Sequence, residues 1–312
     1  MKKNYLTSIL FLVVATVFLF SNYTISAKSN VKGDQDDNVV LVEDGGTGPY
    51  SAIVTEDPGL PGMTIYRPKD LTPFAGKKLP VLLWGNGGCA NTTDEHKNFL
   101  NEIASHGYIV LGIGPLKALQ GGASGGGGMG GTKASQLTEA LDWITKQNNT
   151  TGNDYSDKID VTKVAAMGMS CGGLQAIEIS SDPRISTSVI CNSGIFNQPM
   201  SASLGGMPSL TKDDLMKYHN PVIYIMGGES DMAYPNATDD YKRVNHVPIA
   251  ITNFDVGHGG TYRQPHGGAF TRVALAWLNW QLKGIKDDSK EFLGDDCGLC
   301  KDPEWKIETK NF

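Results

Sequence analysis

Short apolar runs alternate with stretches of helical periodicity along most of the chain. The runs "PVLLWG" (80–85) and "YIVLGIG" (108–114) are apolar throughout, which is typical of strands buried on both faces of a parallel sheet. Between them, apolar residues recur at helical spacing from Phe99 to Ala104, and Gly107 ends the pattern. The alternation predicts an α/β fold with a mostly parallel central sheet and helices on both faces.

The same patterns predict the remaining elements. Two early segments, 52–56 and 63–68, are typical of an antiparallel pair of strands. Further strands are expected at 163–169, 187–194, 221–228 and 248–254, and helices at 135–147, 172–181 and 268–284. Because no proline-rich or charged linker divides this region, we expect one domain over 49–285, with 286–312 as a C-terminal tail that packs on it.

The chain begins with the features of an export signal. Lys2 and Lys3 precede an apolar run from Leu6 to Phe20, and small and polar residues follow up to Ala27. The run is shorter than the roughly 20 residues that a membrane-spanning helix needs. We therefore expect a signal peptide over 1–27 and a secreted or periplasmic protein with no membrane anchor after cleavage. Residues 28–48 are polar, acidic and rich in glycine, which predicts a flexible leader.

Composition narrows the class of protein. Of the 312 residues, 40% are hydrophobic and 19% are charged, which excludes a disordered or collagen-like protein. Without the signal peptide, 25 basic residues face 33 acidic ones, and this net charge of −8 disfavours a nucleic-acid partner. The Gly-rich stretch from Gly121 to Gly131 lacks the Lys-Ser/Thr ending of a phosphate-binding loop, so we expect a flexible surface loop there.

The pattern G-x-S-x-G occurs at residues 168–172, between a strand signal and a helix signal. In this setting the glycines allow a sharp turn that presents the serine hydroxyl at the carboxyl edge of the sheet. The helix after the turn directs backbone N–H groups and the positive end of its dipole toward the same point. We therefore predict that Ser170 is a nucleophile.

A serine nucleophile needs a histidine base and an acid, which in this setting come in the order Ser, acid, His. His258 lies in the loop after the last expected strand and is favoured as the base over His266, which is closer to the final helix. Asp231 stands just past the end of the preceding strand and is favoured as the acid, with Glu229 as the alternative. The predicted triad is Ser170, Asp231 and His258.

The oxyanion formed by serine attack needs two backbone N–H donors. One is expected from Cys171, directly after the nucleophile. The other is expected from the loop after "PVLLW", where three glycines surround Asn86 and let the backbone pass close to the substrate. Gly88 is the favoured donor in this loop.

Five cysteines in an exported chain predict disulfides. Cys297 and Cys300 form a CxxC pair after the last long helix, without a nearby histidine to complete a zinc site. We expect a small structural bridge between them. Any pairing among Cys89, Cys171 and Cys191 stays open.

The segment 193–220 joins two strands at the same edge of the sheet and is too short for a large lid domain. Its Phe196, Met200 and Met207 either line an acyl or aromatic pocket or pack against the core. We predict Phe196 as a substrate-binding residue. A site without a large lid is open to bulky or polymer-attached esters.

Residues from about 50 to 285 resemble the α/β-hydrolase superfamily. The resemblance is closest to the compact secreted esterases of the dienelactone-hydrolase, chlorophyllase and polyester-hydrolase (cutinase-like) group, and rests on "GMSCGG", "WGNGGC" and the segments around Asp231 and His258. The chain departs from many relatives by Asn86 in place of a histidine in the oxyanion loop and by Cys171 after the nucleophile. Its elbow holds a serine, unlike the cysteine of dienelactone hydrolases.

These features predict a secreted serine carboxylic-ester hydrolase that works through an acyl-enzyme, with no metal and no organic cofactor. Feruloyl, acetyl and polyester-type esters are the expected substrates. One alternative is a serine peptidase or amidase, which would use the same triad but needs subsites for a peptide. The other is a catalytically silent binding module, a kind of protein that usually loses its serine or histidine.

Overall fold

The computed structural model describes residues 38–119, 130–198 and 207–312. The predicted signal peptide, the start of the leader, Met200 and nearly all of the Gly-rich stretch lie outside these ranges. The strands are β1 (Val39–Val40), β2 (Ala52–Thr55), β3 (Met63–Pro68), β4 (Leu79–Gly85), β5 (Ile109–Ile113), β6 (Ile159–Met169), β7 (Thr187–Cys191), β8 (Val222–Met226), β9 (Ile249–Phe254) and β10 (Trp305–Lys310). They form one sheet in the order β1-β2-β3-β5-β4-β6-β7-β8-β9-β10.

The central strands of this sheet, β5-β4-β6-β7-β8-β9, run parallel to one another. Antiparallel strands extend it at both edges, with β1, β2 and β3 at one end and β10 at the other. Every residue of β4 and β5 is buried, as their continuous apolar runs predict. The expected mostly parallel sheet is therefore confirmed.

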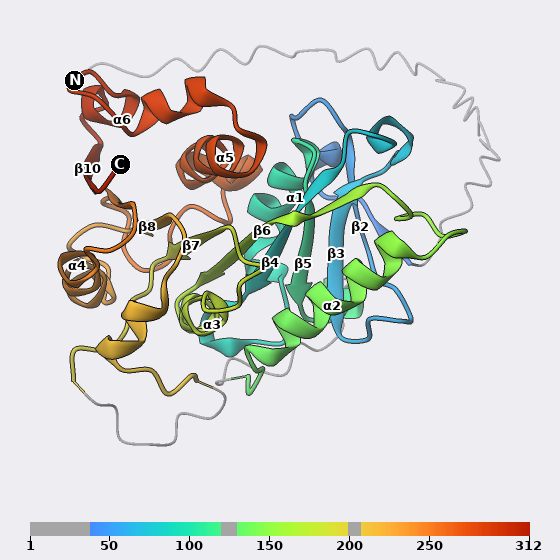
Figure 1. Cartoon of the computed structure of the whole chain (residues 1–312), viewed down its shortest axis with the longest axis horizontal. Helices are drawn as coiled ribbons and strands as arrows, with labels where there is room; N and C mark the ends of the chain where they lie inside the picture. Colours follow the sequence, from blue (N-terminus) through green and yellow to red (C-terminus); the bar gives the residue numbers. More distant parts are fainter. Residues whose placement is uncertain (1–37, 120–129, 199–206) are drawn as a thin grey trace, which may run out of the picture. The chain divides into compact units, whose positions relative to one another are not determined.

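Helices cover both faces of the sheet (Figure 1). They are α1 (Lys97–Ser105), α2 (Ser135–Asn149), α3 (Cys171–Ile179), α4 (Tyr234–Arg243), α5 (Gly268–Lys283) and α6 (Gly298–Lys301). None of them is long and apolar enough to cross a membrane, a statement that covers the described ranges only.

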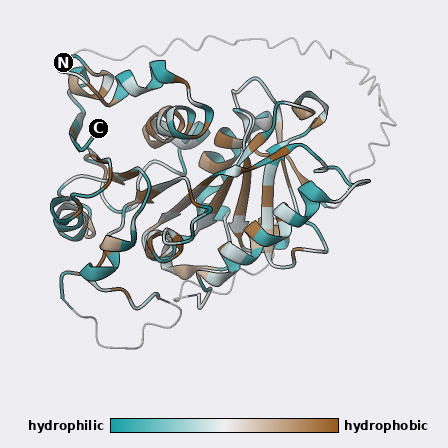
Figure 2. Ribbon diagram, viewed as in Figure 1, coloured by the Kyte–Doolittle hydropathy of each residue, from teal (hydrophilic) through white to brown (hydrophobic). Residues whose placement is uncertain are grey.

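Two hydrophobic cores lie on opposite faces of the sheet. Along β4, Val81 and Leu83 join the core that α2, α3 and α4 cover, whereas Leu82 and Trp84 join the core that α1 and α5 cover. This alternation results from the two-residue period of a strand. Figure 2 shows the result, with apolar colour along the central strands and polar colour concentrated on the helices and loops.

The carboxyl ends of the parallel strands bring distant segments to one edge of the sheet. There β6 leads into Ser170, β7 into Asn192, β8 toward Asp231 and β9 toward His258. In open α/β sheets the crevice at this edge is where ligands bind. The fold thus assembles the predicted site residues from separate parts of the chain.

Residues 38–48, which the sequence analysis assigns to a flexible leader, contact the folded domain. Residues Val39–Val40 pair antiparallel with β2. The Thr47 backbone N–H donates a 2.9 Å hydrogen bond to the Glu102 carboxylate on α1. The described end of the expected flexible leader is therefore part of the folded domain. The polar, Gly-rich composition of the segment does not reveal this, because backbone pairing and turns, rather than an apolar pattern, hold the segment on the domain.

The C-terminal tail contributes the edge strand β10. This strand pairs with β9 over six residues, and Trp305 stacks on Phe254 with ring centroids 5.0 Å apart. The expected Cys297–Cys300 bridge forms just before it. The sequence analysis did not predict the strand, because only Trp305 and Ile307 of its six residues are apolar and most of the strand stays partly exposed.

Candidate active site

Ser170 sits in the tight turn between β6 and α3. Its φ of 54° and ψ of −118° lie outside the regions that side chains normally adopt. Glycines make the turn possible, because a Cβ on Gly172 would lie 2.0 Å from the backbone carbon of Gly85, and a Cβ on Gly168 would lie 2.1 Å from the Gly172 oxygen. A strained serine in such a crowded strand-to-helix turn is typical of a nucleophile elbow.

Hydrogen bonds connect Ser170 to His258 and His258 to Asp231. Nε2 of His258 lies 3.0 Å from Oγ of Ser170, and Nδ1 of His258 lies 2.7 Å from Oδ1 of Asp231. Both distances are in the range that proton transfer requires. When Nδ1 carries the ring proton and donates a hydrogen bond to the carboxylate, Nε2 is unprotonated and can accept the proton of the serine hydroxyl.

The Asp231 carboxylate is buried, with a side chain that is 0% exposed. Besides the His258 bond, it accepts hydrogen bonds from Nδ2 of Asn192 at 2.8 Å, from the Ala233 N–H at 2.9 Å and from the Gly227 N–H at 3.2 Å. Burial acts to raise the pKa of Asp231, but these hydrogen bonds outweigh it and hold the pKa below its usual value. The group is therefore a carboxylate at neutral pH.

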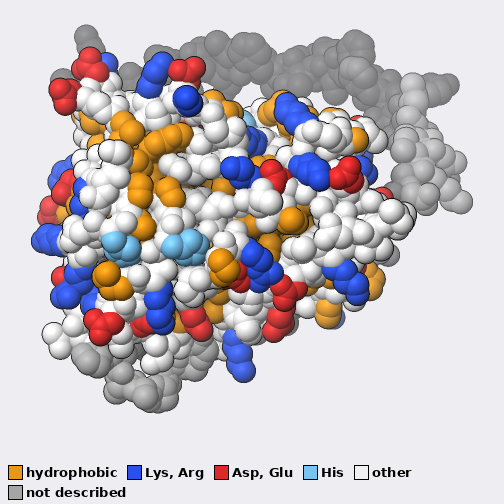
Figure 3. Space-filling model, in the orientation of Figure 1, with side chains coloured by type: hydrophobic (Ala, Val, Ile, Leu, Met, Phe, Trp, Pro, Cys, Tyr) orange, Lys and Arg blue, Asp and Glu red, His pale blue; other side chains and the backbone are white. Residues whose placement is uncertain are grey.

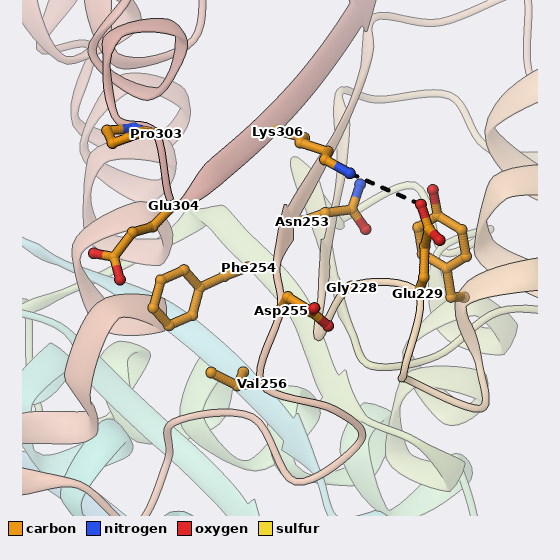
Figure 4. Close-up of a pocket in the computed structure, with 10 residues that line it drawn as sticks. Gly228, Glu229, Asn253, Phe254, Asp255, Val256, Pro303, Glu304 and Lys306 are labelled. Carbon is orange, nitrogen blue, oxygen red and sulfur yellow. Dashed lines mark ion pairs between the residues drawn. The ribbon is translucent and has the colours of Figure 1, made fainter.

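The two alternative residues lie apart from this chain of hydrogen bonds. Glu229 has a side chain that is 76% exposed, and it faces Lys306, whose Nζ lies 3.8 Å from the carboxylate across a surface groove of about 510 Å³ (Figure 4). His266 faces Glu43 and Glu102, with Nδ1 3.2 Å from a Glu102 oxygen. Among the candidate acids and bases, the structure therefore brings Asp231 and His258 to the serine.

Asn192, at the end of β7, is a residue of the site that the sequence analysis missed. It is fully buried and has a positive φ of 43°. Its Nδ2 contacts both the Asp231 carboxylate and, at 3.3 Å, the Gly257 carbonyl oxygen next to His258. Its Oδ1 accepts a hydrogen bond from the buried Tyr262 hydroxyl. Asn192 thus links the loops of the acid and the base; a polar residue directly after a buried strand was the signal in the sequence.

A disulfide between Cys89 and Cys171 joins the loop after β4 to the nucleophile turn. The remaining cysteine, Cys191, is a free buried thiol, and burial raises its pKa to about 12.

Two glycines of the loop after β4 precede Cys89. Gly88 has a φ of 62°, and the position of its missing Cβ borders open space. The missing Cβ of Gly87 would lie 3.9 Å from Cβ of the nucleophile. The Gly87 backbone is therefore close to the serine nucleophile.

A cavity of about 280 Å³ opens at the serine and the histidine. Phe196 and Met207 line it from the segment after β7, Leu174 from α3, and Met232 from the loop before α4. Met232 is 76% exposed, so it forms part of the rim. Apolar walls with a few polar groups suit an acyl or aromatic substituent. Within the described ranges, no cluster of three or more His, Cys, Asp or Glu residues is arranged to hold a metal ion.

A buried histidine lies in an aromatic cluster behind the site. The His96 ring is 5.1 Å from that of Trp84 and 5.0 Å from that of Tyr262. His96 is 3% exposed, and its Nδ1 has no hydrogen-bond partner among the described residues. Burial lowers the pKa of His96 from 6.5 to about 3, so the ring is neutral in the folded protein.

We expect the free energy of unfolding to fall as the pH drops from about 6.5 to 4, in part because the unfolded chain protonates His96 in this window while the native state does not. For one proton the slope reaches about 1.4 kcal/mol per pH unit. His96→Phe should reduce the slope by that amount, and His219→Gln, at an exposed histidine, should not. Urea unfolding at pH 7, 6, 5 and 4.5 measures this, and equal slopes for His96→Phe and wild type would contradict it.

The fold and the strand-to-helix serine turn together define an α/β-hydrolase. A family model described as PET hydrolase-like matches residues 39–288. The chain belongs to this family, a polyester-hydrolase group of α/β-hydrolases, and the resemblance seen in the sequence is confirmed. Members of the family are serine carboxylic-ester hydrolases, and the chain is an enzyme of this class. No curated protein matches the chain.

Proposed function

We propose that the protein is a secreted esterase that cleaves bulky or polymer-attached esters through an acyl-enzyme on Ser170. The observation that carries the proposal is the pair of hydrogen bonds, 3.0 Å and 2.7 Å long, that connect Ser170, His258 and Asp231 at the mouth of an apolar cavity. A serine in this arrangement is activated by the adjacent base, and the buried acid orients that base.

In the acylation step, Oγ of Ser170 attacks the ester carbonyl carbon while Nε2 of His258 takes the hydroxyl proton. The carbonyl oxygen becomes an oxyanion, and the N–H groups of Cys171 and Gly88 stabilise it. Asp231 stabilises the imidazolium without taking its proton. His258 then gives the proton to the leaving alcohol as the carbon–oxygen bond of the ester breaks.

Deacylation repeats these steps with water as the nucleophile. His258 takes a proton from the water, which attacks the acyl carbon, and the same two N–H groups stabilise the second oxyanion. The proton then returns to Oγ of Ser170 as the acyl-serine bond breaks. The products are a carboxylic acid and an alcohol, and the enzyme is restored without a metal or an organic cofactor.

The cavity supports a substrate with an apolar acyl or aromatic group. Its volume of about 280 Å³ suits one aromatic ring with a short substituent, and Phe196 and Met207 are positioned to contact such a ring. Met232 on the rim offers an exposed apolar contact for the part of a polymer that stays outside. Feruloyl esters and aromatic polyester units are therefore favoured over long fatty acyl esters, and small acetyl esters fit as well.

The disulfides of the protein support export. The N-terminal signal predicted over 1–27 lies outside the described residues, but the two disulfides of the domain are typical of a protein that folds in an oxidising compartment.

On the face in view in Figure 3, acidic and basic side chains are interspersed, without a large area of a single charge.

Initial hydrolysis rates on a substrate panel test the proposal. The panel comprises p-nitrophenyl acetate, butyrate and octanoate, methyl ferulate, acetylated xylan, an aromatic polyester film and a dipeptidyl anilide. We expect turnover of the short and aromatic esters, at least tenfold less of the octanoate, and none of the anilide. Cleavage of the anilide would identify a peptidase. No hydrolysis of any substrate, together with no fluorophosphonate labelling, would identify a binding module.

A further inference from the structure

The loop that is expected to supply an oxyanion donor is anchored to the nucleophile turn at both of its ends. At the first end, Gly85 and Gly172 pack so closely that a side chain on Gly172 would clash with the Gly85 backbone. At the second end, the disulfide joins Cys89 to Cys171, with their Cα atoms 5.2 Å apart. The loop between these anchors carries Gly87 and Gly88, and a Cβ on Gly87 would lie 3.9 Å from Cβ of Ser170.

The side chain of Asn86 fixes the first half of this loop. Its Oδ1 accepts a 3.0 Å hydrogen bond from Nε1 of Trp84, and its Nδ2 donates to the carbonyl oxygens of Ile113 at 2.6 Å and Ala90 at 3.0 Å. Gly87 and Gly88 come next and have no side chains of their own to hold them. The bridged Cys89, directly after them in the chain, therefore limits their backbone freedom.

Two further hydrogen bonds stabilise the end of the loop that carries the disulfide. Oγ1 of Thr132 donates a 2.8 Å hydrogen bond to the Cys89 carbonyl oxygen, and Nε2 of Gln175, on α3, donates a 2.9 Å hydrogen bond to the Thr132 carbonyl oxygen. Cys89 and Gln175 are fully buried, and Cys171 is 3% exposed. The disulfide is thus buried beside the cavity and is not exposed on the surface.

We propose that the Cys89–Cys171 disulfide is a positioning element for oxyanion stabilisation, because it sets the distance between the N–H of Cys171 and the N–H of Gly88. The inference rests on the proposed function, in which these two groups are the donors. Such donors must be held within about 0.5 Å of their productive positions. The loss of one donor costs about 100-fold to 1000-fold in kcat, so a loosened donor loop should cost roughly 10-fold to 100-fold.

The variant Cys89→Ala/Cys171→Ala tests this inference, with Cys297→Ala/Cys300→Ala as the matched control that removes the other disulfide. With p-nitrophenyl butyrate, we expect the first variant to lose about 10-fold to 100-fold in kcat while KM stays within about threefold. The inhibition constant of a boronic acid, which forms a tetrahedral adduct on Ser170, should rise in parallel. The control should keep the wild-type kcat and the wild-type inhibition constant.

Wild-type kcat and boronic-acid affinity in the folded Cys89→Ala/Cys171→Ala variant would overturn the inference. Ser170→Ala measured beside it separates this result from a failure of the proposed function: the positioning role fails alone if Ser170→Ala is inactive, and the proposed function fails if Ser170→Ala keeps turnover. Circular dichroism and the unfolding temperature establish that each variant is folded under the assay conditions.

Reduction of the wild-type enzyme keeps the inference testable if the variant does not fold. Dithiothreitol transfers two electrons to a bridge, which yields two thiols and the cyclic disulfide of the reagent. Cys300 is exposed, so the C-terminal bridge should open first, without loss of activity. Activity should fall only when mass spectrometry of alkylated aliquots shows the buried bridge open. Full activity with Cys89 and Cys171 reduced would overturn the inference.

Discussion

Replacement of Ser170 by alanine is expected to lower kcat for ester hydrolysis by about 10⁴-fold to 10⁶-fold, the loss seen when an enzyme of this kind loses its nucleophile. Without Oγ no acyl-enzyme forms, and His258 has no hydroxyl to deprotonate. The fold should tolerate the change, because alanine keeps the Cβ. The lost hydroxyl forms its hydrogen bond with the His258 ring and not with a residue of the core. Initial rates with p-nitrophenyl butyrate and the unfolding temperature measure both effects.

Ser193→Ala is the matched control for labelling by a fluorophosphonate. Ser193 also lines the cavity, but its hydroxyl donates a 2.7 Å hydrogen bond to the Ser170 carbonyl oxygen and not to the histidine. We expect this variant to take up the label and Ser170→Ala to stay unlabelled. A labelled Ser170→Ala protein with undiminished turnover would show that another residue is the nucleophile.

The elements of the fold could be predicted because their signals are local. The apolar runs of β4 and β5 need no knowledge of their neighbours, and the G-x-S-x-G pattern specifies its turn through the size of glycine. The order of strand ends along a parallel sheet then limited the partners of Ser170 to a few loops. For this reason the preferred acid and base were the ones that the fold brings together.

The features that could not be predicted depend on contacts between distant segments. The pairing of Cys89 with Cys171 results from the close packing of β4 against α3, which no local pattern reveals. Asn192 gains its role only because the loop of the acid and the loop of the base both contact its amide. The strand β10 carries a mixed polar pattern and is specified by its pairing with β9.

Asp231→Asn is expected to lower kcat by about 10³-fold to 10⁴-fold, as the loss of the acid does in related triads. The new amide brings N–H donors into a pocket where Asn192, Gly227 and Ala233 already donate. It also favours the histidine tautomer that carries its proton on Nε2, which cannot accept the serine proton. Because its hydrogen bonds hold the pKa of Asp231 below the usual value, the wild-type carboxylate stays charged at neutral pH.

Glu229→Gln is the control that distinguishes the two carboxylates considered as the acid. Glu229 is largely exposed and it pairs with Lys306, so its neutralisation should leave kcat within about twofold of the wild-type value. Steady-state rates from pH 5 to 9 for both variants separate the effects, since only Asp231→Asn changes the tautomer of the base. If Glu229→Gln lost activity and Asp231→Asn kept it, the acid would be Glu229, and the buried position of Asp231 would be structural.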